Sequence, residues 1–176
     1  HLAYAGIEIR YHDAVIANAH VGRTLSVRPY FDPHVAVLKL FPGITREVVE
    51  AVLSVPSLRG VVMETFGSGN APMMPWFLDA LRAAVARGVV IVNVTQCVTG
   101  YVDMTRYETG VLLEKIGLVS GRDATTEAAL TKLMYLLGQG FSSEEVSRLM
   151  AIPLRGEMSL DQEMEGFSRE ISIYRR

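Results

Sequence analysis

A glycine-rich loop with an amide side chain lies near the middle of the chain, in "METFGSGNAP", residues 63–72. Gly67 and Gly69 permit positive φ angles and a close approach of the backbone to a ligand, and the carboxamide of Asn70 offers two donors and one acceptor. Such a loop can hold a small polar, zwitterionic or anionic group. The same residues also form ordinary strand-to-helix turns in which the asparagine bonds its own backbone, and residue types alone favour the turn. Neither phosphate-loop pattern, GxxxxGK[ST] or GxGxxG, is present.

A second polar segment, "TQCVTGYVDM" (95–104), follows the apolar run 89–94. Its first three residues can line a cleft: Thr95, Gln96 and Cys97. A cysteine nucleophile requires a nearby base, and the four histidines all lie in the first fifth of the chain, far from it in sequence. We therefore predict that Cys97 is a small buried thiol.

The residues that follow, "DMTRYETG" (103–110), contain carboxylates without a matching base or a metal-ligand spacing. Asp103 and Glu108 are therefore expected to be solvated loop residues, and no metal site is predicted. Tyr107 is of more interest, because a phenol can pack and also form hydrogen bonds.

Alternating strands and helices have to position these loops. Strands are predicted over 34–41, 60–66 and 89–94, with short ones within 7–12 and 118–121. Helices are predicted after each of the three long strands, and again over 124–138 and 143–151. The alternation predicts an α/β fold, a small Rossmann-like parallel sheet with helices on both faces. Because ligands collect at the carboxyl ends of such strands, both polar loops are candidate sites.

Several side chains have predicted local roles in this fold. Asp123 is expected to cap the helix over 124–138, and Ser142 with Glu145 forms a capping box at the start of the next helix. Lys132, on the first of these helices, is expected to point to solvent or to form a salt bridge.

Length and composition limit the possible classes of protein. The 176 residues suffice for one domain with a proper core. A net charge of -2 provides no field that would gather nucleic acid or an anionic membrane, and no apolar run approaches the roughly 20 residues of a membrane span. The single cysteine excludes an internal disulfide and fits a reducing compartment. The chain begins with His1 and not with methionine, so we expect a fragment or a processed product.

Taken in order, four stretches give the chain a resemblance to the C-terminal half of the cytosolic, type I L-asparaginases: "METFGSGNAP", "VIVNVTQCVTGYVDMTRYETG", "GLVSGRDATTEAALTKLMYLLG" and "LRGEMS". The resemblance implies an interdomain lead-in at 1–33 and a C-terminal α/β domain at 34–176. It also implies a cytoplasmic homodimer or homotetramer that converts L-asparagine to L-aspartate and ammonia without a cofactor. The family's threonine nucleophile and its helpers belong to the N-terminal domain, in motifs such as TGGT and GTDT. Neither motif occurs here, so no catalytic residue is expected in this chain.

The resemblance also implies roles for particular residues. Asn70 and Tyr107 match positions with which this domain completes the substrate site of a neighbouring subunit. "TQC" (95–97) matches part of an effector site through which some bacterial members respond cooperatively to asparagine. Those members have an arginine where this chain has Glu64, and a carboxylate cannot hold the effector's carboxylate in its place. In this respect Glu64 resembles the non-cooperative members of the family.

Two alternatives remain open at this point. One is the amidase-like subunit of an archaeal tRNA-dependent amidotransferase, although the extra tRNA-facing segments of that subunit are not evident. The other is a receiver-like or small-ligand-binding α/β module without chemistry. A receiver would need an acidic cluster and a lysine at the sheet's carboxyl edge, and "FPG" after the first strand argues against it.

Overall fold

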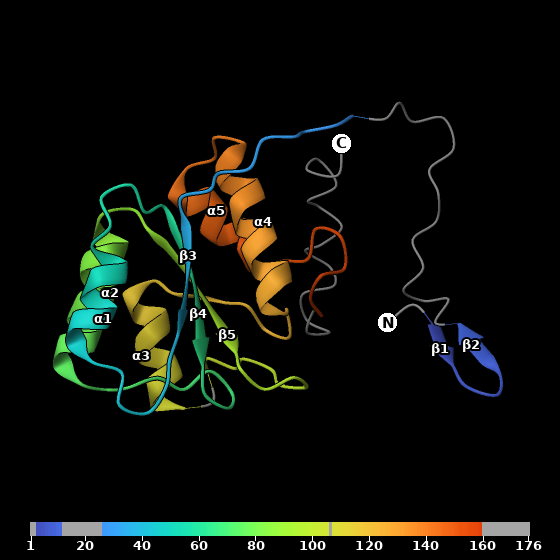
Figure 1. Ribbon diagram of the computed structural model, residues 1–176, viewed down its shortest axis with the longest axis horizontal. Helices are drawn as coiled ribbons and strands as arrows, with labels where there is room; N and C mark the ends of the chain where they lie inside the picture. The colour runs from blue at the N-terminus through green and yellow to red at the C-terminus, as the bar shows by residue number, and fades with distance from the viewer. Residues whose placement is uncertain (1–2, 12–25, 106, 160–176) are drawn as a thin grey trace.

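A four-stranded parallel sheet forms the centre of the computed structural model (Figure 1), which describes residues 3–11, 26–105 and 107–159. The strands follow one another in chain order: β3 (Val35–Lys39), β4 (Gly60–Thr65), β5 (Val90–Thr95) and β6 (Val119–Ser120). Every neighbouring pair is parallel. The predicted strand within 7–12 is β2 (Ile9–Tyr11), which pairs with β1 (Ala3–Ala5) in a separate antiparallel hairpin.

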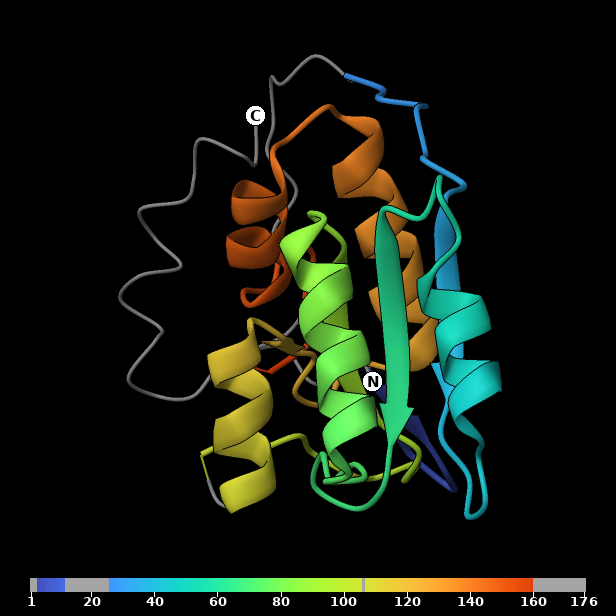
Figure 2. The ribbon, with the colours of Figure 1, turned by 90° about the vertical axis from the view of Figure 1, so that its left-hand side faces the viewer.

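Helices cover both faces of the four-stranded sheet, as Figures 1 and 2 show. One face carries α1 (Arg46–Leu53), α2 (Pro75–Ala86) and α3 (Glu108–Ile116). The other carries α4 (Thr126–Gly138) and α5 (Ser143–Met150). The predicted α/β class is therefore confirmed.

Alternation along the strands divides the core into two layers. On β4, Val61 and Met63 pack with α1 and α2, whereas Val62 packs with α4 and α5. On β5, Ile91 joins the first layer and Val92 the second. A strand buried on both faces needs apolar residues at nearly every position, which is why these strands read as continuous apolar runs in the sequence.

The helix starts confirm one of the two predicted caps and correct the other. Ser142 and Glu145 form the predicted capping box of α5. The cap of α4 is Thr125, whose hydroxyl accepts a hydrogen bond from the backbone N–H of Ala128 at 3.2 Å. The prediction that Asp123 caps this helix was wrong. Its carboxylate accepts instead from the backbone N–H and the hydroxyl of Ser159, at 2.7 and 2.5 Å.

Lys132 is one of the few polar side chains in the core. Its side chain is 5% exposed, and its ammonium lies 2.7 Å from the carboxylate of Glu157. It also donates to the carbonyls of Met150 and Ile152, at 3.3 and 2.5 Å. The predicted salt bridge is confirmed, but it is buried and joins α4 to the segment that follows α5.

Residues 30–33 pack against the end of α4. The backbone N–H of Asp32 donates to the carbonyl of Met134 at 2.9 Å, and a Cβ on Gly138 would clash with the backbone of Tyr30. Asp32 also accepts from Arg59 at 2.7 Å. Burial raises the pKa of Asp32, but hydrogen bonds from His34 and Arg59 outweigh burial and hold that pKa below its ordinary value. This part of the predicted lead-in is thus attached to the α/β core.

None of the helices in the described ranges is both long enough and apolar enough to cross a membrane.

Candidate functional site

The loop after β4 closes in a tight turn at the carboxyl edge of the sheet. The backbone N–H of Phe66 donates to the carbonyl of Asn70 at 2.9 Å, and the N–H of Asn70 donates back to the carbonyl of Phe66 at 2.8 Å. Gly67 and Gly69 have φ angles of +53° and +106°, which residues other than glycine rarely adopt. The two glycines are therefore needed to bring Phe66 and Asn70 together.

Hydrogen bonds from β5 and from the loop that follows it hold this turn in place. Three consecutive carbonyls, those of Gly67, Ser68 and Gly69, accept hydrogen bonds from the hydroxyl of Thr95, the backbone N–H of Asp103 and the amide of Asn93, at 2.5, 3.1 and 3.1 Å. The conformation of the loop is consequently determined by the neighbouring strand as well as by its own glycines.

The side chain of Asn70 is left available by this arrangement. Its backbone closes the turn, but among the described residues its carboxamide has no hydrogen-bond partner, and the residue is only half-buried. In an ordinary strand-to-helix turn, the asparagine side chain would bond its own backbone. The side chain of Asn70 does not do so. A carboxamide with free donors and acceptor at the carboxyl edge of a parallel sheet can bind a polar ligand group.

Thr95 and Gln96 are used mainly within the protein. The hydroxyl of Thr95 bonds Gly67 and also accepts from the backbone N–H of Cys97 at 3.0 Å. The amide of Gln96 donates to the carbonyls of Leu40 and Glu64, at 2.6 and 2.9 Å. Gln96 thus ties together the carboxyl ends of β3, β4 and β5.

Cys97 corrects a prediction. Its thiol is exposed and free, whereas a buried thiol was expected. The physical reason is a turn directly after β5, closed by a hydrogen bond of 2.8 Å from the N–H of Gly100 to the carbonyl of Cys97. The turn carries residues 97–99 out into solvent.

Glu64 points to the opposite face of β4 from its neighbour Thr65, because side chains alternate along a strand. Its carboxylate accepts from the hydroxyl of Thr126, in the first turn of α4, at 2.7 Å. It also pairs with Lys39 on the neighbouring strand at 3.2 Å, and its side chain is 14% exposed. A helix N-terminus and a lysine both favour a negative charge, so Glu64 is well suited to its surroundings as a carboxylate.

Tyr107 stands at the same edge, as the residue that precedes α3. It is 47% exposed, so its ring is accessible from solvent. Asp103 forms a local turn in which its carboxylate accepts from the backbone N–H and the hydroxyl of Thr105, at 3.0 and 2.7 Å. Asp103 was expected to be a solvated loop residue, whereas the structure has it partly buried and bonded within its loop.

Two further residues of this site were missed by sequence reasoning, Thr65 and Asn93. Both are completely buried. The signal was present in "VVIVNV", where an asparagine interrupts a run of apolar residues. A buried amide needs hydrogen-bond partners, so its presence there indicated a specific contact beneath a loop.

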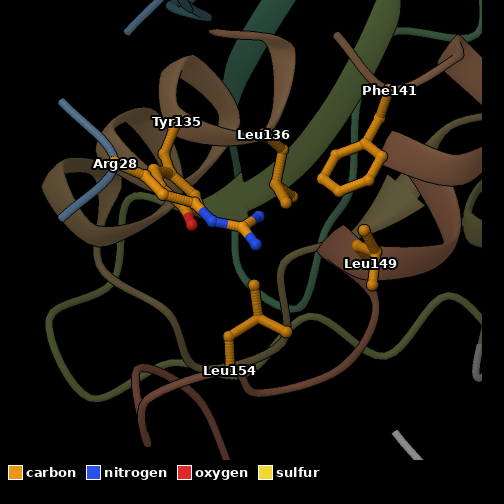
Figure 3. A pocket seen from close by; sticks show the side chains of 6 residues that line it. All are labelled: Arg28, Tyr135, Leu136, Phe141, Leu149 and Leu154. Carbon is orange, nitrogen blue, oxygen red and sulfur yellow. The ribbon is translucent and has the colours of Figure 1, made fainter. Parts of the chain in front are cut away.

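A small cavity elsewhere is no candidate for the site. It has a volume of about 20 Å³, and Figure 3 shows the guanidinium of Arg28 pointing towards its centre. The other lining residues come from α4, α5 and nearby loops: Tyr135, Leu136, Phe141, Leu149 and Leu154. This space holds about one water molecule and lies at the end of α4 away from the carboxyl edge. Within the described ranges, no group of three or more His, Cys, Asp or Glu residues could hold a metal ion.

A parallel sheet covered on both faces, with a glycine loop held at its carboxyl edge, defines a ligand-binding class of α/β domain. The family model of the glutaminase/asparaginase C-terminal domain matches residues 34–150, and the chain belongs to this family.

Individual relatives agree with this family. The chain is 40% identical over 160 residues to L-asparaginase 1 of Escherichia coli (strain K12), covering 91% of this chain and 47% of that protein. It is 44% identical over 160 residues to the 60 kDa lysophospholipase of Mus musculus, covering 90% and 28%. Among solved structures, L-asparaginase I of Vibrio cholerae O1 biovar eltor matches with a TM-score of 0.81 and 43% identity, covering 90% and 48%. The chain thus spans about half the length of these two asparaginases and 28% of the length of the lysophospholipase.

Proposed function

We propose that this chain is the C-terminal domain of an L-asparaginase, an enzyme that hydrolyses the side-chain amide of L-asparagine to give L-aspartate and ammonia. The observation that carries the proposal is the loop at 66–70, whose backbone is held by β5 while the carboxamide of Asn70 stays unbonded among the described residues. Such a carboxamide can pair with the polar groups of an amino-acid substrate without a metal or a cofactor.

The domain division belongs to the same proposal. Residues 34–176 form the C-terminal domain, and residues 1–33 are the lead-in from an N-terminal domain that supplies the threonine nucleophile. The proposal is supported by the match over 34–150 and by the share of the related asparaginases that this chain spans.

The chain's own contribution is to complete a substrate site. Asn70 binds a polar group of asparagine, and Tyr107 adds a hydroxyl and an aromatic surface from the next loop. In a homo-oligomer, a dimer or a tetramer, these two side chains reach the site of a neighbouring subunit. The exposed apolar side chains at this edge support such a contact: Met73, Met74, Val98, Tyr101 and Tyr107.

A cytoplasmic location is part of the proposal as well. It is supported by Cys97, a free and exposed thiol, since thiols stay reduced in that compartment.

The test uses the protein that carries this chain together with its N-terminal half. Asn70→Ala should lower kcat/KM for asparagine by about 5- to 150-fold, which corresponds to the roughly 1–3 kcal/mol of a polar group left unpaired. Tyr107→Phe should lower it as well while keeping the ring in place. Thermal unfolding should be unchanged in both variants, and Ser68→Ala in the same loop is the matched control. Unchanged kinetics for both variants would overturn the proposed substrate site.

Activity assays on the same protein identify its substrate. Release of ammonia from asparagine without any tRNA supports the asparaginase and contradicts the amidotransferase subunit. Because a lysophospholipase is among the relatives, release of fatty acid from lysophosphatidylcholine is measured in parallel. Hydrolysis of that lipid without any hydrolysis of asparagine would overturn the proposal.

A further inference from the structure

Two completely buried polar residues, Thr65 and Asn93, lie at the carboxyl ends of β4 and β5. They face the same layer as Met63 and Ile91, which are apolar. Burying an amide and a hydroxyl in such a layer is unfavourable unless each has a partner. Each of these two side chains therefore needs hydrogen-bond partners within the protein.

Their hydrogen bonds lead from the sheet to the glycine loop. The hydroxyl of Thr65 lies 2.6 Å from Oδ1 of Asn93 and 3.0 Å from the carbonyl of Val94. Nδ2 of Asn93 donates to the carbonyl of Gly69 at 3.1 Å. The Gly69 oxygen can only accept, so the amide must turn its NH₂ group towards the loop and its oxygen towards Thr65. The orientation of Asn93 is thus set from both sides.

The hydrogen bond from Asn93 requires a glycine at position 69. A Cβ at that position would lie 2.7 Å from Cγ1 of Val102 and 3.1 Å from Nδ2 of Asn93. Only glycine at this position allows the loop backbone to approach the side-chain amide of Asn93 closely enough for the hydrogen bond. The next residue in the chain is Asn70.

The Asn93 bond differs from the other two that hold the turn. The Thr95 hydroxyl and the Asp103 backbone N–H bond the loop from partly exposed residues. Water can substitute for such partners. Beneath Gly69, where Asn93 is completely buried, water has no access to replace the amide.

We propose that Asn93, oriented by Thr65, is a positioning residue that holds the carbonyl of Gly69 and thereby sets the place of the Asn70 side chain at the site. The inference rests on the proposed function for its kinetic consequence, but its structural consequence can be measured without any activity.

The structural measurement is hydrogen exchange of the loop amides in the protein that carries this chain with its N-terminal half. The N–H groups of Gly69 and Asn70 both donate to the carbonyl of Phe66, at 3.1 and 2.8 Å, so they report directly on the turn. Asn93→Leu keeps the branched arrangement of side-chain heavy atoms and removes the amide, and it should speed exchange of these amides about tenfold or more. Ile91→Val, two residues earlier on the same face, is the matched control and should leave the exchange unchanged.

A second pair of variants addresses Thr65 and remains usable if Asn93→Leu fails to fold. Thr65→Val removes the hydroxyl that orients the amide and should speed exchange of the same two amides. Thr65→Ser keeps a hydroxyl and should restore slow exchange. Unchanged exchange in both Asn93→Leu and Thr65→Val would overturn the inference, as would equal exchange in Thr65→Val and Thr65→Ser.

Kinetics separate a positioning role from a purely structural one. Asn93→Leu should lower kcat/KM for asparagine about tenfold, but it should have little further effect when Asn70 is already alanine. Independent, multiplying losses in the double variant would overturn the inference while leaving the substrate site intact. If Asn70→Ala alone changes nothing, the proposed role of Asn70 fails, and exchange at Gly69 and Asn70 still decides whether Asn93 positions the loop.

Discussion

At the scale of single residues, Glu64 is the side chain on which the expectation about an effector site depends. Its carboxylate is held between the hydroxyl of Thr126 and the ammonium of Lys39, at 2.7 and 3.2 Å. The resemblance implies that an arginine occupies this position in the cooperative members of the family, where it would receive the carboxylate of an amino-acid effector. Here the position carries a negative charge with partners of its own, which would repel a second carboxylate.

We therefore expect no cooperativity towards asparagine in the complete protein. An effector shifts an equilibrium only by the difference between its affinities for the two states, and a site that binds it poorly in both shifts neither. Initial rates measured against asparagine concentration should follow a hyperbola, and Cys97→Ala should leave its shape unchanged. A sigmoidal curve that Cys97→Ala abolishes would contradict this expectation and restore an effector site at Thr95, Gln96 and Cys97.

At the scale of elements, the buried pair of Lys132 and Glu157 attaches α4 to the segment after α5. Burial lowers the pKa of Lys132 and outweighs the attraction of Glu157, so the charge on Lys132 opposes folding. Burial raises the pKa of Glu157, but the charge and hydrogen bonds of Lys132 and two backbone N–H groups outweigh burial and lower that pKa. The ionised Glu157 is therefore what makes the buried lysine tolerable.

Removing one member of this pair should be costly. Glu157→Ala leaves the ammonium of Lys132 buried without its counter-charge, which should lower the free energy of unfolding at pH 7 by about 3–5 kcal/mol. Urea denaturation measures this change, and Glu114→Ala on the exposed side of α3 serves as the control. A loss below about 1 kcal/mol would show that the carbonyls of Met150 and Ile152 suffice for the lysine.

The same variant has a defined dependence on pH. Because the folded-state pKa of Glu157 is lowered, its stabilising effect is complete above its unfolded pKa of about 4.3 and is lost as the pH falls through the folded value. The difference between wild type and Glu157→Ala should therefore shrink as the pH is lowered from 7 towards 2. A constant difference over that range would contradict this account of the pair.

At the scale of the whole molecule, the two loops of the candidate site are partly exposed at the carboxyl edge of the sheet. The turn at 66–70 and the loop at 95–107 lie together at the carboxyl edge, and exposed apolar side chains lie in or next to them, among them Met74 and Val98. Apolar surface gathered around polar site residues is typical of a surface that another domain or subunit covers.

The chain by itself should release no ammonia from asparagine. It contains neither a TGGT nor a GTDT segment, so no activated threonine is available to attack the amide. The assay compares the purified chain, free of host enzymes, with the same chain after addition of its N-terminal half, which should restore turnover. Turnover by the chain alone at the rate of the complete protein would contradict the proposed division of labour.

The sequence alone determined the architecture, because strands buried on both faces and capped amphipathic helices leave local patterns. "HVAVLKLF", "GVVMETF" and "VVIVNV" became β3, β4 and β5, and the capping box at Ser142 lies where it was predicted. It also located both loops of the site, since strand order along the chain is enough to place them at one edge.

Only the tertiary structure decided what each polar side chain does there. Cys97 is exposed, Asp123 bonds Ser159 instead of capping α4, and Asn93 reaches Gly69, 24 residues away in sequence. Lys132 finds Glu157 beyond the end of another helix. Apart from the exposure of Cys97, which follows from a local turn, these outcomes depend on partners that are distant along the chain. A buried polar group must find a partner wherever the packing brings one, and neither periodicity nor spacing records that position.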